Sequence, residues 1–411
     1  MRRFVWCGVA VAAIAPIAFS VPSVSASASP SGDSAHQGPQ GPKGYVVRQI
    51  LLGSDLTHTF TPAGSATTMT EPLADPDDIT LLGDHIFVGF QNGVGPQGQA
   101  STSGNLDSTV VEMTLKGAPV SQWDVLGKTD GVTADPLADD VIATVNEDAN
   151  SSLYTISPAA PAGAQITHYN YSQQPLPHNG GTDAISIYHG QILISASAPG
   201  TTGAAAPQPG YPAVYSVQLM PGTDVAIVSS VFSDESTARV ANVNSPSFGQ
   251  PVMLGLTDPD SNEVVPRGAR FGGDFVLTSQ GDQEQIFLSP SHWSRGQWSA
   301  GQPKLSVLDL TQSVDDTAWP TSPDGTLYST DSTNDSVDAI TGRFRVDQPL
   351  VAATPCGAND APATCPAPGF PANFLASLNP WTGVVTAVTV QGAAYAPQGG
   401  LLFVPGHGKH H

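Results

Sequence analysis

Residues 76–90 read PDDITLLGDHIFVGF, and this stretch decides the fold. It has an acidic start, an apolar run, a tight Gly-Asp turn and a stronger apolar run, which is the pattern of a β-hairpin. Similar stretches recur at residues 131–145, 181–196, 263–279, 314–331 and 393–405. Several continue into a second hairpin, as in TVVEMTLKGAPVSQWDVL at residues 109–126. The chain is therefore predicted to be all-β and built from repeated pairs of hairpins.

The spacing of these copies indicates how the hairpins are arranged. Two consecutive hairpins form a four-stranded meander, and a period of about 40–55 residues is typical of propeller blades. We predict a single β-propeller over residues 45–405 with about six blades, and seven if an insertion hides a degenerate copy. Insertions are expected near residues 236–262 and 356–371. The strand at residues 45–52 (YVVRQILL) is expected to close the ring against strands near residues 401–404. A β-sandwich array is the alternative.

Both ends of the chain differ in composition from the middle. Residues 1–28 combine Arg2 and Arg3, an apolar run and an A-x-A pattern, which predicts a signal peptide and a secreted protein. Residues 29–44 are rich in Gly and Pro and are predicted to be a flexible leader, and residues 406–411 a disordered tail. In an oxidising compartment, Cys356 and Cys365 are expected to form a disulfide across a surface loop.

The charge balance restricts the partners. The chain has 14 Lys and Arg against 35 Asp and Glu, a net charge of −21. Such a surface repels phosphate backbones and anionic lipids, so we expect neither a nucleic acid nor a membrane as partner. It is compatible with cation binding, and we expect a monomer.

One turn carries a family resemblance. TLYSTDSTNDSVDAI (residues 326–340) resembles the strand, D-x-x-N, strand turn of NHL and YVTN-type propellers. VNEDANSSLYTI and TSQGDQEQIFL echo it more weakly. The resemblance implies the propeller fold, and in this turn Asp331 and Asn334 are expected to bind turn amides. The wider group includes gluconolactonase-like propellers, which hold a channel cation, and streptogramin-lyase-like propellers, which use a channel His.

Acidic residues cluster at the predicted starts of first strands: Asp77, Asp78, Asp135, Asp183, Glu263, Asp315 and Asp316. In a propeller the innermost strands line one channel, so loops from different blades converge at its mouth. Carboxylates gathered there repel one another unless a cation binds or some are protonated. Because oxygen ligands suit Ca²⁺ or Mg²⁺, we predict a metal site at Asp78, Asp183, Glu263 and Asp316. A purely structural role in capping strands is the alternative.

Further polar residues are expected to complete a ligand site. His178 and Asn179 lie in PLPHNGGTD, and His178 is the candidate catalytic residue. Asp258, Asp260 and Asn262 lie in TDPDSNEVVP (residues 257–266), expected to be an inserted acidic loop. Three functions remain open: binding of a small molecule, glycan or protein at the channel mouth, a metal-dependent lactonase-like hydrolase or lyase, and an extracellular scaffold.

Overall fold

The computed structural model describes residues 44–197, 210–290, 304–346, 348–354, 373–397 and 399–406, and the backbone alone at 293–294 and 297–298. The predicted signal peptide, Cys356, Cys365 and residues 407–411 lie outside the described residues. In the described part no helix is long and apolar enough to cross a membrane. The helical content there is one 3₁₀ turn, η1 (Gly53–Asp55).

The strands form four-stranded meanders, called blades here. In the first three blades the order of the strands in the sheet is their order in the sequence. Blade 1 contains β4 (Pro76–Leu82), β5 (His85–Phe90), β6 (Asp107–Thr114) and β7 (Pro119–Leu126). Blade 2 contains β8 (Thr129–Asp135), β9 (Asp140–Val145), β10 (Ser152–Ile156) and β11 (Ile166–Tyr171). Blade 3 contains β12 (Ile185–Tyr188), β13 (Gln191–Ser195), β14 (Pro212–Met220) and β15 (Val225–Ser233), and parallel pairing of β11 with β15 joins blades 2 and 3.

The remaining blades are less regular. Blade 4 contains β18 (Pro259–Val264), β19 (Phe275–Ser279), β20 (Glu284–Leu288) and β23 (Leu305–Asp309), extended by β16 (Thr237–Val240) and β17 (Pro251–Met253). Blade 5 contains β24 (Val314–Ala318), β27 (Leu350–Ala353), β28 (Phe374–Leu378) and β29 (Val385–Ala387). Blade 6 contains β32 (Leu401–Pro405), β25 (Asp324–Asp331), β26 (Ser336–Arg343) and β1 (Val46–Leu52). Short pairs are β2 (Thr57–Phe60) with β3 (Met69–Pro72), β21 (Trp293–Ser294) with β22 (Gln297–Trp298), and β30 (Thr389–Val390) with β31 (Ala393–Ala394).

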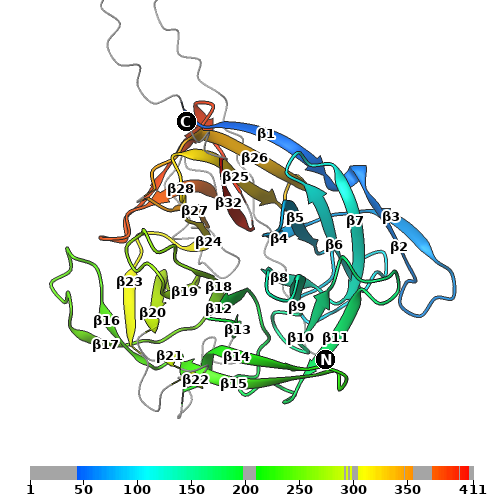
Figure 1. The fold of residues 1–411 in the computed structure, drawn as a ribbon, viewed down its shortest axis with the longest axis horizontal. Coiled ribbons are helices and arrows are strands. Elements are labelled where there is room, and N and C mark those ends of the chain that lie inside the picture. The colour runs from blue at the N-terminus through cyan, green and yellow to red at the C-terminus, as the bar shows by residue number, and fades with distance from the viewer. Residues whose placement is uncertain are drawn as a thin grey trace, which may run out of the picture. The chain divides into compact units, whose positions relative to one another are not determined.

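The inner strands form a closed ring (Figure 1). Contacts run from β4 to β8, then to β12, β18, β24, β32 and back to β4. The core confirms this order, because six buried clusters each join side chains of two successive blades. Middle strands are consequently covered on both faces, and all residues of β10 and β19 are buried. This arrangement is a β-propeller, as the repeated hairpins predicted.

Two of the predicted hairpins were wrong, because the strand pairing that closes the ring divides each of them between two sheets. Residues 314–331 do not form one hairpin, because β24 belongs to blade 5 and β25 to blade 6. Residues 393–405 do not form one either, since β31 pairs with β30 while β32 pairs with β25. The hairpin β25–β26 therefore lies between the two terminal strands: β1 pairs with β26, not with the C-terminal strand. The chain ends share a blade without touching edge to edge.

Candidate functional site

A repeated β-bulge positions the acidic residues. In β4, Pro76 pairs with Phe90 and Ile79 pairs with Val88. Between these pairs, two residues of β4 lie opposite one residue of β5. The same irregularity occurs in β8, β18 and β24. A bulge bends a strand and redirects its side chains. In each bulge two residues oppose a single residue of the partner strand, and these pairs are Asp77-Asp78, Asp130-Gly131, Asp260-Ser261 and Asp315-Asp316.

Hydroxyl groups of neighbouring blades hold these segments in place. Thr144 Oγ1 donates to the carbonyl oxygen of Asp183 at 2.6 Å, and Ser195 Oγ donates to that of Asp260 at 2.5 Å. Thr330 Oγ1 donates to the carbonyl oxygen of Asp77 across the closure of the ring. Because the backbone is fixed from the preceding blade of the ring, each Asp side chain is left to face the axis.

The redirected side chains line one cavity of about 240 Å³ at the centre of the ring. Its lining contains a single basic side chain, that of Lys128. Five of the six inner strands begin with an Asp, and the sixth contributes Gly399 and Gly400 instead. Eight carboxyl groups line the cavity: Asp77, Asp78, Asp130, Glu147, Asp183, Asp260, Asp315 and Asp316.

Lys128 neutralises one side of this acidic cavity. Its Nζ lies 2.8 Å from Asp130 Oδ1 and 2.5 Å from Glu147 Oε1. Burial alone would lower the pKa of Lys128, but the surrounding carboxylates raise it well above its usual value. Lys128 is therefore a fixed cation. Gln91 Nε2 adds a hydrogen bond to Asp77 Oδ2 at 2.8 Å.

The opposite side has no basic partner. Asp260 hydrogen-bonds the carboxyl groups of Asp183 and Asp315. Burial and then the Asp183 carboxylate raise the pKa of Asp260 well above its usual value, so Asp260 carries the shared proton. Burial and the Glu147 carboxylate raise the pKa of Asp183 to about 7. Burial, together with the neighbouring carboxylates, therefore favours protonation in this half of the cavity.

Asp78 and Asp316 occupy equivalent second positions in their bulges and are held alike. Asp78 accepts backbone N–H groups from Ile79 and from Val132 of the next blade, each at 2.7 Å. Asp316 accepts that of Thr317 at 2.7 Å and that of Leu401 at 2.5 Å. Burial, against the effect of these amides, raises the pKa of Asp78 to about 7. Their orientations are thus fixed by the backbone of two blades.

Three buried oxygen atoms in the cavity lining have no hydrogen-bond partner among the described residues: Asp130 Oδ2, Asn262 Oδ1 and Asp260 Oδ2, the last on a residue that adjoins other carboxyl groups. Asp130 is 3% exposed, yet its Oδ2 makes no hydrogen bond. Asn262 is 8% exposed, and its Nδ2 donates to Ala184 O at 2.5 Å while its Oδ1 makes none. Buried acceptors without donors are unfavourable by about 1–3 kcal/mol each. The site therefore offers negative charge and free acceptors, which suit a ligand that brings positive charge and donors.

The predicted metal ligands are divided between two cavities. Asp78, Asp183 and Asp316 line the acidic cavity, whereas Glu263 lines a second cavity that Asp78 and Asp316 also reach. No group of three or more His, Cys, Asp or Glu side chains in the described residues is arranged to hold a metal ion.

Residues 257–266 are not an inserted loop, which corrects the sequence expectation. They contain β18, which is an inner strand of blade 4. The bulge at Asp260 and Ser261 interrupts the alternation of side chains along this strand, so the stretch does not have the sequence pattern of a regular strand. Asp260 and Asn262 line the acidic cavity as a result, but Asp258 does not. Burial and the neighbouring Asp282 carboxylate raise the pKa of Asp258 to about 6.

Asp135 also lies elsewhere than expected. It ends β8 and accepts the backbone N–H groups of Leu137 and Ala138 at the turn into β9. The acid at the start of that strand is Asp130 instead. Sequence reasoning missed Asp130, Lys128 and Glu147 as site residues. A signal was present: P-D-D, T-D-G, P-D-S and V-D-D begin inner strands at residues 76, 129, 259 and 314, and T-D-A at residue 182 directly precedes another.

His178 does not line the acidic cavity. It is completely buried, with Nε2 2.7 Å from Gly181 O and 3.2 Å from Ser197 O. Since both partners are carbonyl acceptors, Nε2 carries the proton and Nδ1 accepts the Tyr215 hydroxyl at 2.7 Å. Burial lowers the pKa of His178 to about 4, so the ring is neutral and structural. Asn179 is exposed, with φ of +58°, in the adjoining turn.

The expected turn role of Asp331 is confirmed. Its Oδ1 accepts the backbone N–H groups of Thr333 and Asn334, each at 3.1 Å, and its Oδ2 accepts Asn334 Nδ2 at 2.7 Å. The left-handed residue of this turn is Asp335, with φ of +50°. These contacts close the hairpin β25–β26 and lie outside the acidic cavity.

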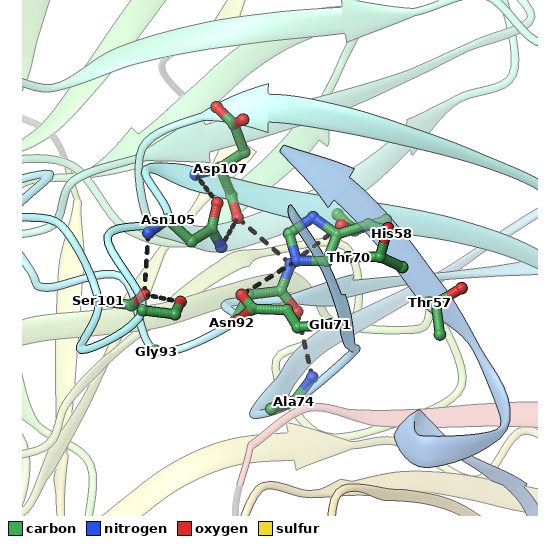
Figure 2. Close-up of polar contacts among 12 residues, drawn as sticks. Thr57, His58, Thr70, Glu71, Ala74, Asn92, Gly93, Ser101, Asn105 and Asp107 are labelled. Atoms are coloured by element: carbon green, nitrogen blue, oxygen red, sulfur yellow. Dashed lines mark hydrogen bonds and ion pairs between the residues drawn. The ribbon is translucent and has the colours of Figure 1, made fainter. Parts of the chain in front are cut away.

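A second polar cluster fastens the hairpin β2–β3 to blade 1 (Figure 2). His58 is 2% exposed; its Nε2 lies 3.3 Å from Glu71 Oε1 within the hairpin, and its Nδ1 lies 3.7 Å from Asp124 Oδ1 of β7 in blade 1. Asn92 Nδ2 donates to Thr109 Oγ1 at 2.9 Å and to Asp107 O at 3.2 Å, as the dashed lines toward Asp107 show. These bonds join a loop, a hairpin and a blade, which is a structural task.

No family model matches this chain, and no curated protein matches it. The resemblance to NHL and YVTN-type propellers therefore stays a prediction.

Solved structures with a similar course of the chain have unrelated sequences. A luciferin-regenerating enzyme is 10% identical with a TM-score of 0.39, covering 87% of this chain and 94% of that one. Citrobacter koseri AztD is 12% identical with a TM-score of 0.35, covering 89% and 99%. The β-propeller domain of Myceliophteria thermophila Cps50 (Swd1) is 7% identical with a TM-score of 0.41, covering 84% and 92%. At such scores the fold assignment rests on the strand pairing described above, and no function follows.

Proposed function

We propose that this propeller binds a small cation in its acidic cavity. The observation that carries the proposal is the lining itself: eight carboxyl groups face one lysine in about 240 Å³. Ligand binding at a channel mouth was one expectation from the sequence, and the signal peptide predicted over residues 1–28 would place this binding outside the cytoplasm. Ca²⁺ or Mg²⁺ would enter with part of its water shell, and an organic ammonium group would enter directly.

The cation is expected on the side away from Lys128. There Asp183, Asp260 and Asp315 have no positive partner, so a cation replaces the proton that they share. On the other side Lys128 already occupies the equivalent position between Asp130 and Glu147.

Titration calorimetry with CaCl₂, MgCl₂ and methylammonium chloride, in a buffer without amines, tests the proposal. We expect one site for at least one of these cations and a loss of at least about tenfold in affinity for Asp260→Asn, because a charge-assisted contact of about 1.5–3 kcal/mol is removed. Asp84→Asn is the matched control, since that side chain is 93% exposed in the turn after β4. Absence of binding by all three cations, or equal binding by the Asp260 variant, would refute the proposal.

A further inference from the structure

A second cavity of about 390 Å³ adjoins the acidic one along the axis, and all six inner strands contribute to its lining. It shares Asp78, Asn262 and Asp316 with the acidic cavity, so the two cavities meet at these three side chains. A ligand held at this junction therefore has room to extend into the second cavity.

The lining of the second cavity is mixed, with more polar than apolar surface. Three of its aliphatic residues are buried in the core between blades: Ile79, Val132 and Ile185. Half-buried polar residues line it as well, namely Thr80 of β4, Thr133 of β8 and Glu263 of β18. Burial, and then the Asp316 carboxylate, raise the pKa of Glu263 well above its usual value, so this side chain is neutral. The second cavity thus presents hydroxyl groups and an uncharged carboxyl group.

Two acceptors without partners lie close to the junction. Asp260 and Asn262 are two residues apart on β18, and Asp260 Oδ2 and Asn262 Oδ1 are buried without a hydrogen bond among the described residues. Asn262 Nδ2 donates to Ala184 O at 2.5 Å, which fixes the direction of the amide. Because Asn262 lines both cavities, a charged donor bound at these two oxygens lies at the entrance to the second cavity.

We infer that the ligand is a hydroxylated ammonium compound, of the amino alcohol or amino sugar class, with its ammonium group among the carboxylates and its hydroxyl groups in the second cavity. The inference rests on the proposed function and adds the class of ligand.

The chemistry of the two cavities supports this division of the ligand. An ammonium group brings one positive charge and three donors, which match the free acceptors Asp260 Oδ2 and Asn262 Oδ1. A hydroxyl group both donates and accepts, as do the side chains of Thr80, Thr133 and neutral Glu263. An alkyl chain in the same place would take these groups out of water without giving them a partner, which is unfavourable.

The test compares ammonium ions of similar size with and without hydroxyl groups. Calorimetry should show glucosamine binding at least about tenfold more tightly than cyclohexylammonium, because several hydrogen bonds each add a favourable increment. The smaller pair, ethanolammonium and propylammonium, differs by a single hydroxyl group and should show a preference of about threefold in the same direction. Glucose has the hydroxyl groups without the charge and should not bind measurably.

The outcomes separate this inference from the proposed function. If cyclohexylammonium binds as tightly as glucosamine, or if CaCl₂ or MgCl₂ binds and neither amine does, the inference is wrong while the proposed function stands. If no cation of any kind binds, both fail.

One variant locates the hydroxyl groups. Thr133→Val removes a hydroxyl group from the second cavity with little change in shape, and it should reduce the preference for glucosamine over cyclohexylammonium by about fivefold. Thr167→Val is the matched control, because Thr167 is also half-buried in blade 2 but lies on β11, outside both cavities. An unchanged preference in the Thr133 variant, or an equal reduction in the control, would overturn the inference.

Discussion

The two halves of the acidic cavity use the same residue type with opposite consequences. On one side Asp130 and Glu147 share Lys128, an internal cation at 2.8 and 2.5 Å. On the other side Asp183, Asp260 and Asp315 share a proton. The difference teaches that the propeller repeat supplies the carboxylates, while a single lysine decides which of them are available to a ligand.

The largest expected effect is that of pH on the side without a lysine. Asp78 and Asp183 have folded-state pKa values of about 7, well above the unfolded value near 3.8. The folded state therefore binds more protons between these limits, so the stabilisation that these two groups contribute is fully present below about pH 4 and is lost as pH rises through about 7. Urea unfolding across this range should show a decline of several kcal/mol, and addition of a bound cation should reduce it. Stability that rises over the same range would contradict the assigned proton binding.

Removal of the internal cation should have the next largest effect. Lys128→Met leaves the buried Asp130 and the partly exposed Glu147 without a cationic partner, which should destabilise the fold by about 3 kcal/mol at neutral pH. Chemical denaturation measures this, and the loss should shrink at acid pH as the carboxylates protonate. Lys116→Met is the control, since Lys116 is exposed in the turn after β6 and its replacement should change stability by less than about 0.5 kcal/mol.

The one inner strand that starts without an acid gives a third comparison. Gly399 has φ of +129°, and a Cβ there would lie 2.5 Å from Thr330 Oγ1 and 2.9 Å from Asp77 O. Gly399→Ala should therefore destabilise the protein by about 1–3 kcal/mol. Gly392→Ala has a similar backbone, with φ of +80°, but no atom within 4 Å of the added Cβ, and should cost about 1 kcal/mol. Equal thermal shifts for both variants would mean that the contact with Asp77 is not tight.

The smallest expected change has the opposite sign. Asp183→Asn removes one like charge from the side without a lysine and keeps a group that can hydrogen-bond Asp260. Without ligand, it should stabilise the protein by about 1 kcal/mol at about pH 8 and have no effect near pH 4, where Asp183 is protonated. Thermal unfolding at the two pH values measures this. Destabilisation at both would indicate that Asp183 is needed for structure.

Much of the candidate site could be predicted from the sequence, but not the full set of residues that line the cavity. Asp78, Asp183, Asp260, Asn262 and Asp316 were named from the sequence and line the acidic cavity. Asp130 was missed because Asp135 has the same acidic character, and only the bulge in β8 shows which of them faces the axis. The sequence alone also made His178 a candidate site residue. Only its buried contacts with Gly181 and Tyr215 identify it as structural.

The sequence by itself determined the all-β class, the recurring hairpins and the acidic start of the inner strands, because alternation, turn residues and charge are local properties. Only the tertiary structure decided that β25 and β26 cross into the last blade, that Lys128 neutralises one half of the cavity, and that a second cavity adjoins it. These features depend on which distant strands become neighbours. Closing the ring brings together residues from all its blades, and no short stretch of sequence contains that information.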